Sequence, residues 1–301
     1  MSNSLRFLAV ILALAAATAA CAEPVTLEYK FRKGEVDKYR LAMDMRLDLS
    51  GIAAATGQAD MPPMDLSMSI ELIQKTLDVY SDGSAKVKVT YRNPIIQGVK
   101  MPAAASKSAK ALQDQAVVMR ISKHGRTMSI QGLEKLVGQD MPVNLSRFMD
   151  ASSGSALLPD GPVEVGESWM QDIPLPFGDS QIYLQSTLAS YDEEIWNLRV
   201  ARINQSCSGK LDIKAMVESF LGAMAASLKQ KAPDLSSISG ELLLNGQMTE
   251  FFAPSIGKLL KSSGNLDASL NVTLPPSAVQ QGAPPSLSCA INMRMGMTRF
   301  N

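Results

Sequence analysis

Apolar and polar residues alternate with a period of two along much of this chain. In residues 41–49 the odd positions are apolar, whereas Asp44, Arg46 and Asp48 occupy even positions. Such alternation is typical of an antiparallel strand with one buried and one solvated face. The same pattern recurs in five further segments: 64–72, 87–91, 182–188, 266–274 and 291–297. The sequence therefore predicts a mainly antiparallel β-sheet.

Turn residues and a few helical patterns complete the predicted architecture. Asp82-Gly83 lies between two apolar runs and predicts a β-hairpin. From about 212 to 230, apolar residues follow the 3.6-residue spacing of an amphipathic helix that Asp212 would cap. Weaker helical patterns lie at 103–115, 133–137 and 143–149. We therefore expect an α+β fold, in which a few helices cover a curved sheet or open half-barrel.

Short sequence matches suggest that the chain contains two related halves. Lys33-Gly34-Glu35 is similar to Val165-Gly166-Glu167, and Gly125 and Gly132 have the same spacing as Gly257 and Gly264. Glycines at turns also recur by chance, so chance similarity is the alternative. We expect a β-rich half at residues 23–160 and a second at 161–301, either separate or packed as one domain.

The N-terminus has the three-part order of a secretory signal peptide over residues 1–22. Arg6 precedes an apolar run that is shorter than the roughly 20 residues of a membrane-spanning helix, and small residues follow. Cleavage after Ala22 would release a soluble periplasmic or secreted protein. Alternatively, residues 18–21 resemble a lipobox, and lipidation of Cys21 would anchor the protein to a membrane. Strand-like sequence already begins at Val25, which leaves little linker and favours the soluble product.

Export would place the two remaining cysteines in an oxidising compartment. Cys207 and Cys289 are then an even pair, which predicts a disulfide bond. The alternative is two separate buried thiols, because spacing in sequence does not show that two Cα atoms come within bridging range.

Composition argues against binding to nucleic acid. Lys plus Arg and Asp plus Glu both number 29, so the chain has no net charge with which to attract a phosphate backbone. Aromatic residues make up only 5% of the chain, which provides few platforms for stacked bases. Methionine, by contrast, is abundant at 18 residues, and many methionines occupy the apolar positions of the predicted strands.

The sequence shows no recognisable catalytic, cofactor or metal site. Its one histidine, His124, lies in an expected turn between Lys123 and Gly125. One histidine excludes the usual multi-histidine metal sites, and no G-x-S-x-G, G-x-G-x-x-G or P-loop pattern is present. Asp44, Asp48 and Glu71 could form a carboxylate pair, but alternation places them on a solvated sheet face. We therefore expect no enzyme activity and no cofactor.

Three motifs give the chain a resemblance to an uncharacterised family of exported bacterial proteins. These motifs are LEYKFRKGE at 27–35, LPDGPVEVGESW at 158–169 and FAPSIGKLL at 252–260. The family has no assigned activity, so the resemblance implies export and a β-rich fold only. The expected architecture is also similar to the half-barrels of periplasmic lipoprotein carriers, although fold alone does not fix function.

These observations favour a non-enzymatic binding protein for a hydrophobic ligand or an apolar partner segment. Methionine side chains are flexible and polarisable, so they suit a surface that adapts to varied apolar partners. We expect Met43, Met45, Met68 and Met295 to line an apolar cavity. The alternative is a structural or interaction protein of the bacterial cell envelope, in which the methionines are ordinary core residues.

Overall fold

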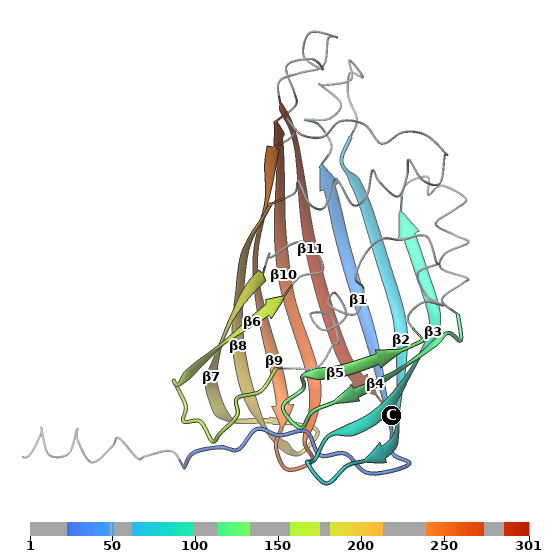
Figure 1. Cartoon of the computed structure of the whole chain (residues 1–301), viewed down its shortest axis with the longest axis vertical. Coiled ribbons are helices and arrows are strands. Elements are labelled where there is room, and N and C mark those ends of the chain that lie inside the picture. Colours follow the sequence, from blue (N-terminus) through green and yellow to red (C-terminus); the bar gives the residue numbers. More distant parts are fainter. Residues whose placement is uncertain are drawn as a thin grey trace, which may run out of the picture.

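One antiparallel sheet contains all the strands of the residues that the structure describes (Figure 1). The structure, a computed structural model, describes residues 23–48, 50, 62–98, 113–132, 157–174, 181–212, 239–273 and 286–300. Eleven strands lie in these ranges: β1 (Val36–Asp48), β2 (Met64–Val79), β3 (Ala85–Gly98), β4 (Ala116–Ile121), β5 (Thr127–Gln131), β6 (Ser168–Pro174), β7 (Gln181–Ile195), β8 (Leu198–Asp212), β9 (Ser239–Ala253), β10 (Lys258–Thr273) and β11 (Ser286–Phe300). Their order across the sheet is β5-β4-β3-β2-β1-β11-β10-β9-β8-β7-β6.

The predicted antiparallel sheet is confirmed, but the α+β assignment is wrong. Every secondary-structure element in the described ranges is a strand, and none of these ranges contains a helix able to cross a membrane. Asp212, the expected helix cap, is the last residue of β8, and the helix predicted beyond it lies outside the described residues. The predicted helices at 133–137 and 143–149 also lie outside them, while residues 113–115 form a turn before β4.

The sheet buries its own inner face by curling, which explains how a core forms without covering helices in the described residues. Figure 1 shows β4 and β5 at one end and β6 at the other bending in front of the long central strands. Residues on β1, β2, β3, β4, β7, β8, β9, β10 and β11 therefore belong to one hydrophobic cluster. The predicted hairpin at Asp82-Gly83 is confirmed between β2 and β3, where Gly83 has a φ of 79°.

The first and last strands meet in the middle of the sheet. β1 pairs with β11 along its length, with Leu41 opposite Met297 and Met45 opposite Met293. Strands β1–β5 form one continuous side of the sheet and β6–β11 the other.

A hydrogen-bond pattern recurs at the start of these two sides. The Gly34 N–H donates to the Thr76 carbonyl, and the Thr76 N–H donates to the Glu35 carbonyl. Gly166 and Glu167 make the equivalent pair of bonds with Leu188. The division into halves at residue 160 stays a prediction.

The base of the curled sheet is closed by the N-terminal segment. The side chains of Leu27 and Leu158 are fully buried there, and Val25 forms an isolated bridge with Val163. The Tyr29 ring packs edge-on against Phe252 at 5.2 Å between centroids. This base therefore holds several fully buried side chains of the apolar core.

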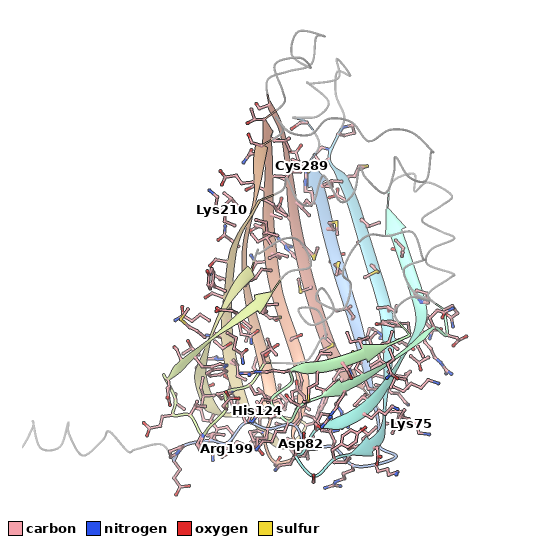
Figure 2. The ribbon with its side chains drawn as sticks, in the orientation of Figure 1. Lys75, Asp82, His124, Arg199, Lys210 and Cys289 are labelled. Carbon is pink, nitrogen blue, oxygen red and sulfur yellow. The ribbon has the colours of Figure 1, made fainter. Side chains whose placement is uncertain are left out.

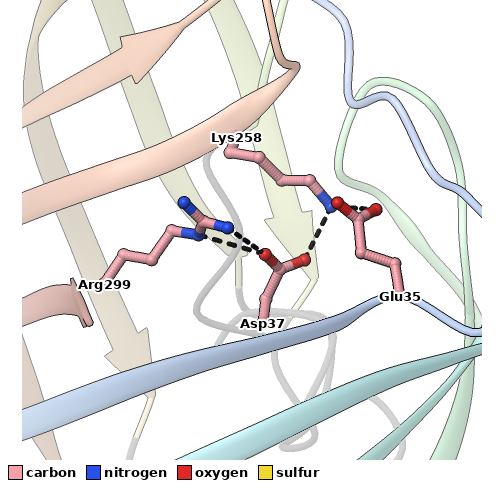
Figure 3. Close-up of polar contacts among 4 residues, drawn as sticks. All are labelled: Glu35, Asp37, Lys258 and Arg299. Atoms are coloured by element: carbon pink, nitrogen blue, oxygen red, sulfur yellow. Dashed lines mark hydrogen bonds and ion pairs between the residues drawn. The ribbon is translucent and has the colours of Figure 1, made fainter. Parts of the chain in front are cut away.

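A cluster of charged residues lies near the base, where β1 and β11 meet (Figure 3). The Asp37 carboxylate is 7% exposed and accepts hydrogen bonds from Lys258 at 2.6 Å and from Arg299 at 2.8 Å. Lys258 also contacts Glu35 at 2.9 Å. Burial, with the nearby Asp37 charge, raises the pKa of the neighbouring Tyr39 well above its ordinary value. The cluster joins residues from the two ends of the chain.

We expect Asp37→Ala to destabilise the protein strongly. Removing one partner from a buried ion pair leaves uncompensated charge and costs about 3–5 kcal/mol in the free energy of unfolding. Asp44→Ala on the same strand is the matched control, because Asp44 is exposed and accepts a hydrogen bond only from Ser67 among the contacts described; its expected cost is below about 1 kcal/mol. Urea unfolding followed by tryptophan fluorescence measures both values, and equal losses would contradict the structural role of Asp37.

Candidate binding face

Residues that pair directly across an antiparallel sheet point to the same side, so the register defines rows of side chains on each face. We call the side that carries Tyr39 and Leu72 the inner face, because both residues belong to the core cluster. Three successive rows on its central strands are formed almost entirely by apolar side chains. They are Met248–Gly264–Met295–Met43–Met68, Gly246–Leu266–Met293–Met45–Leu66 and Leu244–Ala268–Ile291–Leu47–Met64, each running from β9 to β2. We call them the methionine rows.

Burial decreases along β1 from the base towards the methionine rows. Tyr39 is 4% exposed and belongs to the core cluster. Met43 and Met45, further along the same face, are only half-buried. Neither residue belongs to the hydrophobic clusters described for the chain. The methionine rows thus present apolar surface that is not packed into the hydrophobic core.

The four methionines expected to line a cavity are neighbours on this face, while the cavity itself stays a prediction. Met295, Met43 and Met68 are neighbours in one row, and Met45 follows in the next. Figure 2 shows sulfur atoms gathered over the middle of β11, β1 and β2. The structure therefore places the predicted residues side by side on the inner face.

The inner face beside the methionine rows also contains four buried polar residues: Ser186, Gln205, Glu250 and Ser262. Glu250 on β9 is 3% exposed, and it pairs with Ile203 on β8 and Ser262 on β10. Gln205 and Ser186 lie in the adjacent row, where the Gln205 amide donates to the Ser186 hydroxyl at 3.2 Å. The Glu250 Oε2 atom is buried without a hydrogen-bond partner. Burial alone raises the pKa of Glu250 to about 8, so its carboxyl is mainly protonated at neutral pH.

The sequence contained a signal for this polar cluster that our reading missed. The inner-face positions of β9 include Leu242, Leu244, Met248 and Phe252, and Glu250 occupies the same alternation phase. A carboxylate at an apolar position of a strand is an exception to the hydrophobic pattern. Such exceptions concentrate at functional sites.

The predicted disulfide bond is not formed, and both thiols are free. Cys207 lies on β8 and Cys289 on β11, with β9 and β10 between them. Three strand spacings of about 4.8 Å separate them by at least about 14 Å, whereas a disulfide requires Cα atoms within about 7 Å. Burial raises the pKa of both thiols. Cys21, the alternative lipidation site, lies outside the described residues.

The remaining ionisable residues singled out from the sequence lie away from the inner face. His124 is confirmed in the turn between β4 and β5, where it is half-buried rather than exposed. Asp44 is exposed on the outer face, and Glu71 pairs there with Arg40 at 3.1 Å. The described residues contain no group of three or more His, Cys, Asp or Glu side chains that could hold a metal ion.

A separate cavity of about 910 Å³ lies by the N-terminal segment. Its lining includes Pro24, Lys30, Tyr191, Arg199 and Pro254. The Lys30 ammonium donates to the Ser255 carbonyl, and the Arg199 guanidinium donates to the Tyr191 carbonyl and stacks on the Tyr191 ring. Both cations are thus already engaged within the chain, which makes the inner face the better candidate site.

Comparison with known proteins leaves the chain without an established family. No protein-family model matches it, and no curated protein matches it. A solved structure of lipovitellin, described in terms of its lipid–protein interactions, is similar with a TM-score of 0.46 and 10% sequence identity. That similarity covers 90% of this chain, which spans 26% of the lipovitellin chain. The resemblance to exported bacterial proteins stays a prediction.

The buried carboxyl predicts a pH dependence of stability. Glu250 has a raised pKa of about 8 in the folded state and an ordinary value of about 4.3 when unfolded. The folded state therefore binds more protons between these values, and stability falls as pH rises from about 4.3 to about 8.

We expect Glu250→Gln to remove this contribution. From pH 5 to pH 8, the melting temperature of the wild type should fall by at least about 3 °C more than that of the variant. Glu194→Gln, at an exposed position on β7, should leave the wild-type slope unchanged. Thermal unfolding followed by circular dichroism checks this, and parallel curves for wild type and Glu250→Gln would contradict a raised pKa.

Proposed function

We propose that this chain is an exported, non-enzymatic binding protein that holds a hydrophobic ligand against the methionine rows. The observation that carries the proposal is that apolar side chains fill three adjacent rows on one face and keep accessible area. Contiguous apolar surface that is only partly buried is uncommon in proteins without a partner and marks binding sites. Export rests on the N-terminal sequence alone.

The chemistry of the face suits a ligand of variable shape. Methionine contributes to all three rows, and its unbranched thioether side chain adopts many conformations at little energetic cost. Gly246 on β9 and Gly264 on β10 add no side chain to the first two rows. A face built in this way supplies contact area without specifying one rigid shape, which favours flexible hydrocarbon chains over planar rigid ligands.

The proposal predicts that charge on the inner face abolishes binding while charge on the outer face does not. Met43 and Ala42 are adjacent on β1 but point to opposite faces, so Met43→Asp and Ala42→Asp add the same charge to the same strand. We expect Met43→Asp to weaken binding of the apolar dye N-phenyl-1-naphthylamine at least about tenfold, because an ionised carboxylate is costly to bury. Ala42→Asp should change the affinity less than about twofold.

Two measurements protect this test against a folding artefact. Thermal unfolding shows whether each variant is folded, and Met43→Leu should retain dye binding because it keeps the apolar surface.

Native mass spectrometry of the purified protein detects a bound lipid directly. No dye binding to the wild type and no lipid in the mass spectrum would favour a structural protein of the cell envelope instead.

A further inference from the structure

Glu250 lies at the boundary between the buried core and the methionine rows. Its row contains Ile203 and Met297, which are 0% and 5% exposed. Met248, two residues earlier on β9, belongs to the first methionine row and is half-buried. A ligand that covers the methionine rows would therefore extend up to the Glu250 carboxyl.

The carboxyl has hydrogen-bonding capacity that the protein does not use. Its Oε2 atom is buried and has no hydrogen-bond partner, which is unfavourable to the folded state. Gln205 and Ser186 in the adjacent row bond to each other, and neither is a partner of Oε2. A buried carboxyl without a hydrogen-bond partner, next to an accessible apolar face, is the arrangement expected of a group that bonds to a ligand atom.

We propose, on the basis of the proposed function, that Glu250 donates a hydrogen bond to an uncharged carbonyl of a long-chain ester or amide lying on the methionine rows. The inference deepens that function by naming the ligand class. A protonated carboxyl has one O–H donor, and an ester or amide carbonyl is a strong acceptor that carries no charge into the apolar site.

The surroundings of Glu250 favour an uncharged polar group over a charged one. Its row neighbours are Ile203 and Ser262, and its neighbours along the same face of β9 are Met248 and Phe252. None of these side chains is charged, so a buried ligand carboxylate would lack a cationic partner. A ligand ammonium group would require Glu250 to ionise in the site, which adds the desolvation of two charges.

A series of ligands with equal chain length tests the inference. The probes are hexadecane, methyl palmitate, palmitate and hexadecylamine, each displacing N-phenyl-1-naphthylamine from the full-length protein. We expect methyl palmitate to bind roughly threefold to tenfold more tightly than hexadecane, which corresponds to one net hydrogen bond. Palmitate and hexadecylamine should bind less tightly than methyl palmitate.

Two substitutions at the same position separate the hydrogen bond from packing. Glu250→Leu removes the donor, and the advantage of methyl palmitate over hexadecane should fall below about twofold. Glu250→Gln keeps an N–H donor and should retain the advantage. Each variant is judged by the ratio of its methyl palmitate affinity to its hexadecane affinity, because a change of packing at position 250 alters the binding of both ligands.

The possible outcomes distinguish this inference from the proposed function. If hexadecane binds but the ester advantage is absent, or persists in Glu250→Leu, the role of Glu250 is overturned and the binding function stands. A preference for palmitate or hexadecylamine also overturns the inference, since the site would then select charge. Failure of both the dye and hexadecane to bind overturns the proposed function and this inference together.

Discussion

The pairing of β1 with β11 is the constraint on which the rest of the structure depends. It joins the beginning of the described chain to its end and converts two runs of sequential strands into one sheet. A slip of one residue in this pairing would turn every apolar side chain of β1 to the opposite face. The Asp37–Arg299 ion pair, buried at the base of the same two strands, favours the observed register because it forms only when these residues lie together. Side chains far apart in sequence, such as Met43 and Met295, become neighbours as a consequence.

The inner face combines two features that do not favour stability. Apolar side chains in the methionine rows keep accessible surface, and Glu250 keeps an unsatisfied polar atom in the interior. Burying the first and pairing the second would each stabilise the folded chain. The core at the base, with Leu27, Leu158 and Phe252 fully buried, provides stability elsewhere in the sheet. This separation between a packed base and an unsatisfied central face is typical of proteins in which a binding site departs from the local rules of folding.

Local patterns predicted the strands well, because apolar and polar residues alternate within each strand segment. Residues 41–49, for example, identified most of β1 and its inner face correctly. The fold class was wrong because local patterns do not show that the edge strands of a curved sheet can cover its inner face, and we had expected helices to do so. The pairing of Cys207 with Cys289 failed for a related reason, since parity of cysteines says nothing about the two strands inserted between them. Glu250 was missed because a single carboxylate in an alternating segment is recognised as a candidate site residue only when its burial and the missing hydrogen-bond partner of Oε2 are known. The sequence shows neither.

The position of the methionines bears on whether they are ordinary core residues or part of a binding surface. On β1 and β2 the core residues of the inner face are stiffer and nearly inaccessible, as Tyr39 and Ile70 show at 4% exposure each, whereas on β11 the core residue Met297 is itself a methionine at 5%. Met43 and Met68, the next pair along the same face, are half-buried and lie outside the core clusters. Flexible side chains specify a packed core poorly, but they conform readily to a ligand surface. The change from stiff, buried residues to flexible, accessible ones along a single strand therefore favours two functions for the inner face: the base holds the fold together, and the methionine rows supply contact area for a ligand.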